Sequence, residues 1–455
     1  MFTLAQTLAI VIFVGMLVNV IIGKGHRYIP ALIGAALTIV VVFFIVLRDP
    51  SLAINVLNLG QIAQFNFWVP GQEQIESHGV NWQTIIFIAG MMTMVEGLGS
   101  VGFLRWLCLY VARMVNYKVV PILIVFMLLS AFLAMFIDSI TVMLFMTPVI
   151  IELARLLKFD PVPIIIAVIF AADTGGSATM AGDPPNIIIG TALGYTFTDF
   201  VFNTGPLAWA GVAVALGYFY FRFRKTLTSS QQANSDGSPV RYPEPKEAIV
   251  KPLLFKIQAA VFITVVALLV SHAWSGLSVA LIGCIAAAST LIAAGSREAR
   301  HIIQRVDWRT LLFFIGLFVA VGGLEETGLL RMFAEYIGRT SGGEMRLAIP
   351  LILWGSAGTS AVVDSIPLTA AMVPVIVDIS RTTGLTLSTL AWTLALGAIK
   401  GGCFTPIGAS ANVVGTAIAD REGYHISWGR FIKIAFPVGI AMVSLSHLLL
   451  LVRYA

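Results

Sequence analysis

The sequence has 455 residues, of which 58% are hydrophobic and only 11% are charged, and its formal net charge is +5. Because soluble domains carry about 25% charged residues, this composition excludes a water-soluble protein. Apolar runs close to the roughly 20 residues that cross a bilayer as a helix recur along the chain, without the alternation of a membrane barrel. We therefore predict an all-α polytopic membrane protein.

The polar residues exclude several functional classes. The basic residues are spread over short segments between apolar runs, which is typical of the loop bias that orients membrane proteins rather than of a nucleic-acid surface. Cys108, Cys284 and Cys403 stand far apart in apolar surroundings and provide neither a disulfide framework nor a paired metal site. The six histidines are scattered, and no nucleophile–base or phosphate-loop pattern is present. We expect no enzyme activity, no cofactor and no nucleic-acid partner.

Residues 1–80 begin the chain with two long apolar runs, Leu4–Ile22 and Ile29–Leu47, followed by the more polar segment 49–80. We interpret the two runs as scaffold helices and the segment as lying outside the cell. The first run lacks a basic leader and a small-residue cleavage site, so it is predicted to be a retained span rather than a signal peptide.

An internal repeat follows, with one constant offset that takes Asn81 to Asp307, Asp138 to Asp364 and Asn186 to Asn412. Unrelated apolar segments share Leu and Val by chance, but they do not share Trp, Asp, Pro and Asn in register. We assign residues 81–221 to repeat 1 and 307–455 to repeat 2. Between them we place a flexible cytoplasmic linker, 222–256, and further scaffold helices, 257–306.

The basic residues predict that the two repeats have opposite orientations. Placing Lys24, Arg27, the 222–256 linker and most other basic segments in the cytoplasm satisfies the positive-inside rule. The N-terminus then lies outside, repeat 1 begins outside, and repeat 2 begins inside. Inverted repeats are the usual plan of transporters that alternate access around a fixed site.

Each repeat contains an apolar stretch interrupted by Asp-Ser, at Asp138-Ser139 and at Asp364-Ser365. Both flanks of the first stretch are basic, so the chain must enter the membrane and turn back. We predict re-entrant hairpins at about 120–157 and about 347–380, with the Asp-Ser pairs at their tips. Asp and Ser are strong helix N-caps, which suits a returning half-helix.

A second interruption in each repeat is rich in Gly and Pro, from Thr174 to Asn186 and from Gly401 to Asn412. We predict broken helices at about 162–193 and about 387–419. Non-helical backbone persists at membrane depth only when it is buried in protein or lines a wet cavity. The helix N-termini at such breaks suit an anionic or polar solute, and the freed oxygen atoms suit a small cation such as sodium.

Charged residues in or beside these breaks are the candidates for coupling transport to protons. A charge at the bilayer centre costs about 2.5–3.5 kcal/mol, so such residues need a partner or water. Aspartates here also suit a purely capping role. Lys400 stands at the repeat position that Thr174 holds in repeat 1. Its ammonium suits four roles: replacing a bound cation, pairing with an aspartate, contacting an anion, or a purely structural role. The residues are Asp138, Asp173, Asp183, Asp364 and Lys400.

Two motifs, Gly182-Asp183-Pro184-Pro185-Asn186 and Ile407–Val414, together with the two Asp-Ser tips, resemble the ion transporter superfamily. The resemblance is to its arsenite-pump (ArsB) and P-protein branch. It implies a moving transport domain on a scaffold, a homodimer, and a soluble ATPase subunit if the protein is an arsenite pump. It also implies a site at the tips and breaks, with sodium as a candidate metal at the tips. The residues that we expect to bind solute or ion are Asp138, Ser139, Thr141, Thr179, Gly182, Asp183, Asn186, Asp364, Ser365, Thr369, Thr405, Gly408, Ser410 and Asn412.

The expected function is secondary active transport across the inner membrane. The dicarboxylate members of the superfamily carry Ser-Asn-Thr at the tips, where this chain has Asp-Ser, so we expect a small inorganic solute. Arsenite or antimonite efflux coupled to proton entry is the leading hypothesis. Sodium-coupled transport of citrate or a dicarboxylate, and cation/proton antiport, are the alternatives.

Overall fold

The computed structural model describes residues 2–22, 26–69, 79–233 and 242–455, and these residues form helices without any strand. By length and composition, seven of the described helices can cross a membrane, or up to nine if each of two bent helix pairs forms one span. The prediction of an all-α polytopic membrane protein is confirmed.

The first half of the chain contains the N-terminal helices and the helices of repeat 1. They are α1 (Leu4–Ile22), α2 (Tyr28–Leu37), its π-helical continuation η1 (Thr38–Val46), α3 (Pro50–Leu57), η2 (Leu59–Ala63), α4 (Phe65–Trp68), α5 (Trp82–Ser100), α6 (Phe103–Met114), α7 (Val119–Ala134), α8 (Ser139–Leu157), α9 (Val162–Gly176), α10 (Pro184–Leu193), α11 (Phe197–Asn203) and α12 (Gly205–Ala233).

The second half begins with a short turn before two long helices and then continues through repeat 2. Its elements are η3 (Pro245–Ala248), α13 (Pro252–Ser275), α14 (Val279–Arg305), α15 (Trp308–Glu326), α16 (Leu329–Ser341), α17 (Met345–Ser360), α18 (Ser365–Thr383), α19 (Leu387–Gly402), α20 (Ser410–Arg421) and α21 (Trp428–Tyr454).

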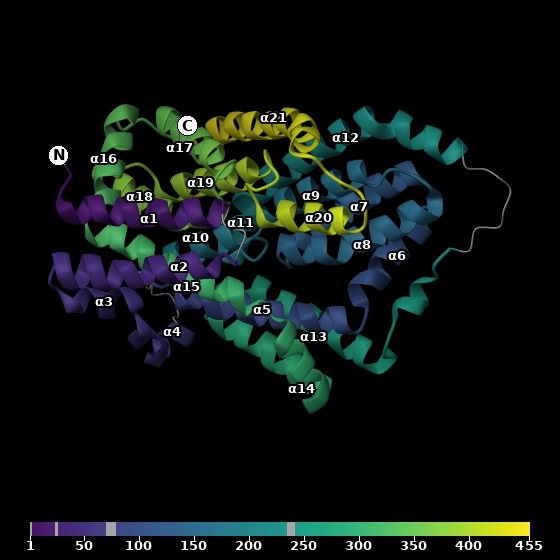
Figure 1. Cartoon of the computed structure of the whole chain (residues 1–455), viewed down its shortest axis with the longest axis horizontal. Coiled ribbons are helices and arrows are strands. Elements are labelled where there is room, and N and C mark those ends of the chain that lie inside the picture. The colour runs from purple at the N-terminus through teal and green to yellow at the C-terminus, as the bar shows by residue number, and fades with distance from the viewer. Residues whose placement is uncertain (1, 23–25, 70–78, 234–241) are drawn as a thin grey trace.

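Two helical hairpins, α7–α8 and α17–α18, approach each other from opposite ends of the molecule (Figure 1). The tip aspartate of each hairpin caps the returning helix. The Asp138 carboxylate accepts a hydrogen bond from the Thr141 N–H at 2.9 Å. The Asp364 carboxylate accepts one from the Ile366 N–H at 3.2 Å. The caps satisfy backbone donors that a helix start leaves unpaired, which explains why each chain reversal occurs at Asp-Ser.

Each hairpin packs against the first half of the broken helix of its own repeat, α7 on α9 and α17 on α19, whereas the second halves pack on the hairpin of the other repeat, α20 on α8 and α10 on α18. The contact within each repeat is so close that it requires glycine. A Cβ atom added at Gly175 would lie 2.3 Å from the Ala131 carbonyl oxygen, and one at Gly401 would lie 2.3 Å from the Ala357 carbonyl oxygen. The same backbone approach therefore occurs in both repeats.

The helices that begin the two repeats pack crosswise. Helix α5 of repeat 1 lies against α14, which precedes repeat 2, and α15 of repeat 2 lies against α2, which precedes repeat 1. Figure 1 shows α5, α13, α14 and α15 together on one side of the hairpins. The halves are thus interlocked, and the predicted fold class, two inverted repeats each with a re-entrant hairpin and a broken helix, is confirmed.

The segment predicted to be a flexible tether, 222–256, is ordered over much of its length. Helix α12 runs through its first part to Ala233, and residues 234–241 lie outside the described part of the chain. After them, the Tyr242 ring stacks on the Tyr117 ring with centroids 4.4 Å apart, and the Tyr117 hydroxyl donates to the Pro243 carbonyl at 2.7 Å. Stacking and hydrogen bonding hold this end of the linker against the base of the first hairpin, so the expectation of flexibility is wrong for these residues.

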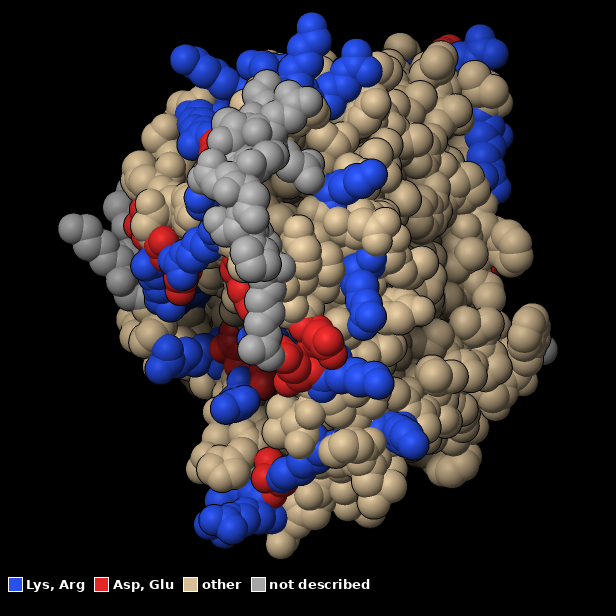
Figure 2. Space-filling model, turned by 90° about the vertical axis from the view of Figure 1, so that its right-hand side faces the viewer, with Lys and Arg blue, Asp and Glu red and all other residues tan. Residues whose placement is uncertain are grey.

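Many Lys and Arg side chains gather at the end of the molecule where this linker lies (Figure 2). Ion pairs join the elements there, including Arg105–Glu152 at 2.9 Å and Arg155–Glu422 at 2.7 Å. This is the end that the positive-inside rule assigns to the cytoplasm. The orientation of the chain in the membrane stays a prediction.

Candidate functional site: a cavity between the hairpin tips

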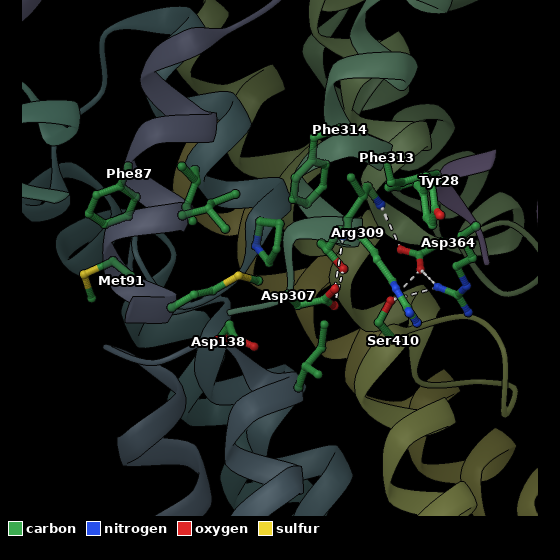
Figure 3. Close-up of a pocket in the computed structure, with 18 of the residues that line it drawn as sticks. Tyr28, Phe87, Met91, Asp138, Asp307, Arg309, Phe313, Phe314, Asp364 and Ser410 are labelled. Atoms are coloured by element: carbon green, nitrogen blue, oxygen red, sulfur yellow. Dashed lines mark hydrogen bonds and ion pairs between the residues drawn. The ribbon is translucent and has the colours of Figure 1, made fainter. Parts of the chain in front are cut away.

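A cavity of about 330 Å³ lies where the two hairpin tips meet the α1–α2 turn and the first turn of α15 (Figure 3). The side chains of Asp307 and Arg309 are exposed, whereas Phe87, Phe314 and Asp364 are buried. The residues that line the cavity are His26, Arg27, Tyr28, Phe87, Ile88, Met91, Met92, Phe136, Asp138, Ile140, Ala181, Pro184, Ile187, Asp307, Arg309, Thr310, Phe313, Phe314, Asp364, Ile366 and Ser410. The cavity thus touches both repeats and the N-terminal helices.

A half-buried ion pair lies on one wall of the cavity. The Arg27 guanidinium lies 2.9 Å from Oδ2 of Asp364, whose side chain is only 7% exposed. The Ser410 hydroxyl donates to the same oxygen at 2.8 Å, and the Arg27 guanidinium donates to the Ser410 hydroxyl at 3.1 Å. Arg27, Asp364 and Ser410 therefore contact one another in a closed triangle, and dashed lines mark these contacts around Asp364 and Ser410 in Figure 3. Both oxygens of Asp364 are therefore occupied by protein donors.

Three different parts of the chain bring this triangle together. Arg27 is in the turn before α2, Asp364 caps α18 at the hairpin tip, and Ser410 is the first residue of α20 after the break. A second guanidinium comes from Arg309 in the first turn of α15, 3.1 Å from the His26 ring. In Figure 3 the Arg309 side chain extends toward Asp364 and Ser410. Two cationic side chains therefore face the cavity.

The tip of the first hairpin has no such cation among the described residues. The Asp138 carboxylate accepts from the Thr141 N–H and from the Thr141 hydroxyl, the latter at 2.7 Å. The neighbouring Ser139 hydroxyl donates to Asp183 at 2.9 Å. A hydroxyl-to-carboxylate bond between tip and break thus occurs in both repeats. The carboxylate is on the break in repeat 1 and on the tip in repeat 2.

The predicted binding residues divide into two groups. Asp138, Asp364 and Ser410 line the cavity. The others hold the tips and breaks in shape or lie beside them, and they do not line the cavity in this conformation. They are Ser139, Thr141, Thr179, Gly182, Asp183, Asn186, Ser365, Thr369, Thr405, Gly408 and Asn412.

Two asparagines show why residues of the second group occur at the breaks. The Asn186 amide donates to the Thr179 carbonyl at 2.8 Å, and the Asn412 amide donates to the Thr405 carbonyl at 2.8 Å. Each amide also donates to a glycine carbonyl before the break. Carbonyls that leave a helix inside a membrane need such donors because no lipid atom can replace them. The asparagines therefore close each break from within.

Several buried oxygen atoms near the breaks have no hydrogen-bond partner in the described part of the chain. They include Oδ1 of Asp173 and the amide oxygens of Asn186 and Asn412. The other carboxylate oxygen of Asp173 lies 3.6 Å from the Cys403 sulfur. Unpartnered buried oxygens are costly unless water, a proton or a small cation satisfies them. These atoms are therefore candidates for contact with water, a proton or a small cation.

Lys400 is completely buried, and it does not line the cavity. Its ammonium donates to the Leu207 carbonyl at 3.2 Å and to the Ser446 hydroxyl at 2.5 Å, on α12 and α21. A Cβ atom added at Gly211 would lie 3.3 Å from this ammonium, so glycine leaves room for it. No carboxylate among the described residues forms an ion pair with Lys400. The sequence is compatible with several roles for Lys400. Of these, the ion pair with an aspartate is not present among the described residues.

We expect Lys400→Met to fold at least as stably as the parent protein. A buried ammonium without a carboxylate partner is poorly compensated for its lost hydration, so an apolar side chain of similar volume should leave the free energy of unfolding unchanged or raise it. Thermal unfolding of the purified protein measures this, and a large drop in the unfolding temperature would contradict it. The pH dependence of transport by the same variant tests the proposed proton role, since an unchanged profile removes Lys400 from the pathway.

Arg27 and Arg309 line the cavity without being among the residues predicted from the sequence, although Arg309 leaves a signal there. Arg309 stands at the repeat position where Gln83 stands in the first half, and its neighbour Asp307 stands where Asn81 does. Asp307 and Arg309 are thus charged residues whose counterparts in repeat 1 are neutral, just as Lys400 is the charged counterpart of Thr174. Arg27 lies before the repeat and was assigned to a cytoplasmic loop. Its pairing with Asp364 places it in the cavity instead.

Comparison with known proteins agrees with this architecture. The family model described as citrate transporter, CitMHS, matches residues 17–397. An uncharacterized transporter of Mycobacterium tuberculosis is 33% identical over 378 residues, which is 83% of this chain and 87% of that protein. The human P protein is 28% identical over 468 residues, covering 85% of this chain but only 55% of the P protein.

Two solved structures share the fold at low sequence identity. The YdaH transporter of Alcanivorax borkumensis has a TM-score of 0.56 at 14% identity and covers 98% of this chain and 97% of its own. MtrF of Neisseria gonorrhoeae has a TM-score of 0.54 at 13% identity and covers 100% of this chain and 96% of its own. The resemblance to the ion transporter superfamily and to P protein is thus confirmed. The chain belongs to the citrate transporter family CitMHS, within that superfamily, and is a multi-pass membrane transporter rather than an enzyme.

Proposed function

We propose that this transporter moves a small organic anion with carboxylate groups, citrate being the first candidate, by alternating access. One observation carries the proposal: the guanidinium groups of Arg27 and Arg309 line a cavity that lies between the hairpin tips of two inverted repeats. Guanidinium groups match carboxylates in shape and charge. The description of the matching family as citrate transporter supports the same substrate class.

The shape of the cavity suits a small solute. Its volume of about 330 Å³ is at the lower end of the range for small-molecule sites. Met91, Met92 and Phe313 provide apolar walls, and the charged groups stand at the hairpin tips and at the start of α15. An organic acid offers both carboxylates for the arginines and a carbon skeleton for these walls.

Alternating access requires the tips to face each side of the membrane in turn. We propose that the hairpins and broken helices move as a transport domain against a scaffold of α1, α2, α5 and α13–α15, with the protein as a homodimer in the inner membrane. The N-terminus is then outside and the 222–256 linker cytoplasmic. In that orientation the exposed residues Asp307 and Arg309 put the opening of the cavity on the cytoplasmic side.

Protons are the proposed coupling ion. Asp138, Asp173, Asp183, Asp364 and Lys400 are the candidate carriers, because they are buried or half-buried at the tips and breaks. Sodium is the alternative, and the unpartnered oxygens of Asp173, Asn186 and Asn412 support it. The predicted binding residues at the breaks would then hold the coupling ion rather than the anion.

Efflux of arsenite or antimonite competes with this proposal. Asp138, Asp364 and Ser410 line the cavity and can accept hydrogen bonds from an uncharged, hydroxylated solute. The Cys403 thiol does not line the cavity, so that mode would rely on oxygen contacts. A soluble ATPase subunit is an expected partner only if the protein is an arsenite pump.

Purified protein in liposomes separates the candidates. Labelled citrate, with either a proton gradient or a sodium gradient imposed, is expected to accumulate only with the proton gradient. Accumulation with the sodium gradient alone would assign sodium as the coupling ion. Arsenite flux in the same vesicles, without citrate flux, would replace the proposal by the arsenite candidate. Protein-free liposomes provide the control for leakage of each solute.

A further inference from the structure

Asp364 is bound in the cavity as an external carboxylate would be. Its Oδ2 receives the Arg27 guanidinium at 2.9 Å and the Ser410 hydroxyl at 2.8 Å, and its Oδ1 receives the Ile366 N–H at 3.2 Å. A guanidinium and a hydroxyl converging on one carboxylate oxygen form a ready-made anion site. In this conformation, a side chain of the protein fills that site.

Arg27 cannot hold Asp364 and a substrate carboxylate equally well. The Ser410 hydroxyl has one proton and donates it to Asp364, beside the Arg27 guanidinium. The site formed by these two donors therefore accepts one carboxylate at a time. In the empty carrier that carboxylate belongs to Asp364.

We propose that Asp364 occupies the position on Arg27 that a substrate carboxylate takes, so that an anion binds there only as Asp364 leaves in its protonated form. Asp364 takes one proton from the aqueous cavity, and its ion pair with Arg27 breaks. The substrate carboxylate then forms the new pair with Arg27. One proton thus binds with each anion, which makes Asp364 a positioning residue that couples the two. The inference rests on the proposed transport of a carboxylate anion.

Other titratable or charged groups line the cavity or lie near Asp364 on the surrounding elements. They are His26 on the α1–α2 turn, Asp307 and Arg309 on α15, Asp138 on the opposite tip, and Asp173 and Asp183 on and after α9. Asp138 and Asp307 accept hydrogen bonds from their own helix starts, at Thr141 and Thr310. Asp173 and Asp183 do not line the cavity. Asp364 is the only carboxylate among the described residues that forms an ion pair with Arg27.

The repeat supports the assignment by contrast. Asp138 holds the same place on the first hairpin, yet its described partners are the N–H and hydroxyl of Thr141. The two tips therefore share the capping function, and the ion pair is added at one tip only. Capping alone does not require Arg27, so the Arg27–Asp364 ion pair is a feature of the second tip that the first tip lacks among the described residues.

The test measures protons taken up when citrate binds. Calorimetric titration of the whole protein in nanodiscs, in two buffers of different ionisation heat and above the last ionisation of citrate, gives protons bound per citrate. The parent protein is expected to take up about one proton per citrate. The Asp364→Asn variant should take up no proton when citrate binds. It should bind citrate about tenfold more tightly, because the carboxylate that competes for Arg27 is removed.

Two further variants make the result decisive. Asn is a good N-cap, so Asp364→Asn should fold; Asp364→Ser is a second uncharged cap and should behave alike. Asp160→Asn breaks an ion pair with Arg430 away from the cavity and should retain the proton uptake of the parent protein. Failure of the parent protein to bind or transport citrate would overturn the proposed function. Citrate binding without proton uptake, or unchanged uptake in both Asp364 variants, would overturn this inference alone.

Discussion

Arg27→Gln is expected to lower the rate of citrate transport by at least about a hundredfold, because the variant loses the charge that pairs with the substrate carboxylate. It also leaves Asp364 without its cation. Breaking a buried ion pair by removing one partner costs about 3–5 kcal/mol, although the 36% exposure of Arg27 lowers that figure here. Initial rates in liposomes, normalised to incorporated protein, measure the effect.

A matched variant separates this effect from general loss of charge. Arg105 pairs with Glu152 at the same distance, 2.9 Å, but both side chains are well exposed. Exposed pairs contribute about 0–1 kcal/mol, so Arg105→Gln should transport citrate at close to the parent rate. Arg27→Lys keeps the positive charge but loses the planar guanidinium, so its rate of citrate transport should lie between those of Arg27→Gln and Arg105→Gln. Parent-like transport by Arg27→Gln would remove Arg27 from the site.

Gly182→Ala is expected to destabilise the protein by about 3 kcal/mol or more, at the upper end of what overpacking costs. A Cβ atom there would lie 2.4 Å from the Ala134 carbonyl oxygen and 2.4 Å from the Gly176 carbonyl oxygen. Both obstacles are backbone atoms of the hairpin and of the broken helix, so neither can rotate away. The break would have to widen, and the amide of Asn186 would lose its carbonyl partners.

The repeat provides a second test of the same idea, and α12 provides a control. Gly408→Ala should be similarly damaging, since its Cβ would lie 2.5 Å from the Gly402 carbonyl oxygen. At Gly217 no atom lies within 4 Å of an added Cβ, so Gly217→Ala should leave stability unchanged or raise it by up to about 1 kcal/mol. The unfolding temperatures of the three purified variants compare them directly. Equal values for all three would show that the breaks tolerate side chains.

Much of the fold followed from the sequence because its signals are local. A chain with 11% charged residues must face lipid, whatever its tertiary structure. Asp-Ser within an apolar stretch favours a helix start, and Gly and Pro within another prevent a continuous helix, so the tips and breaks were predictable from short segments. The repeat then related one half to the other. Of the residues predicted to bind solute or ion, Asp138, Asp364 and Ser410 line the cavity.

The tertiary structure decided which polar groups meet. Arg27 and Asp364 are separated by most of the chain, and the sequence around Arg27 is equally compatible with an exposed loop. Lys400 could have faced the cavity, but the neighbouring helices α12 and α21 provide its hydrogen-bond partners. Local patterns determine where a helix begins, ends or breaks, because backbone hydrogen bonding is a short-range requirement. The partner of a buried charge depends on how distant helices pack, and that packing brought an arginine onto the second hairpin tip.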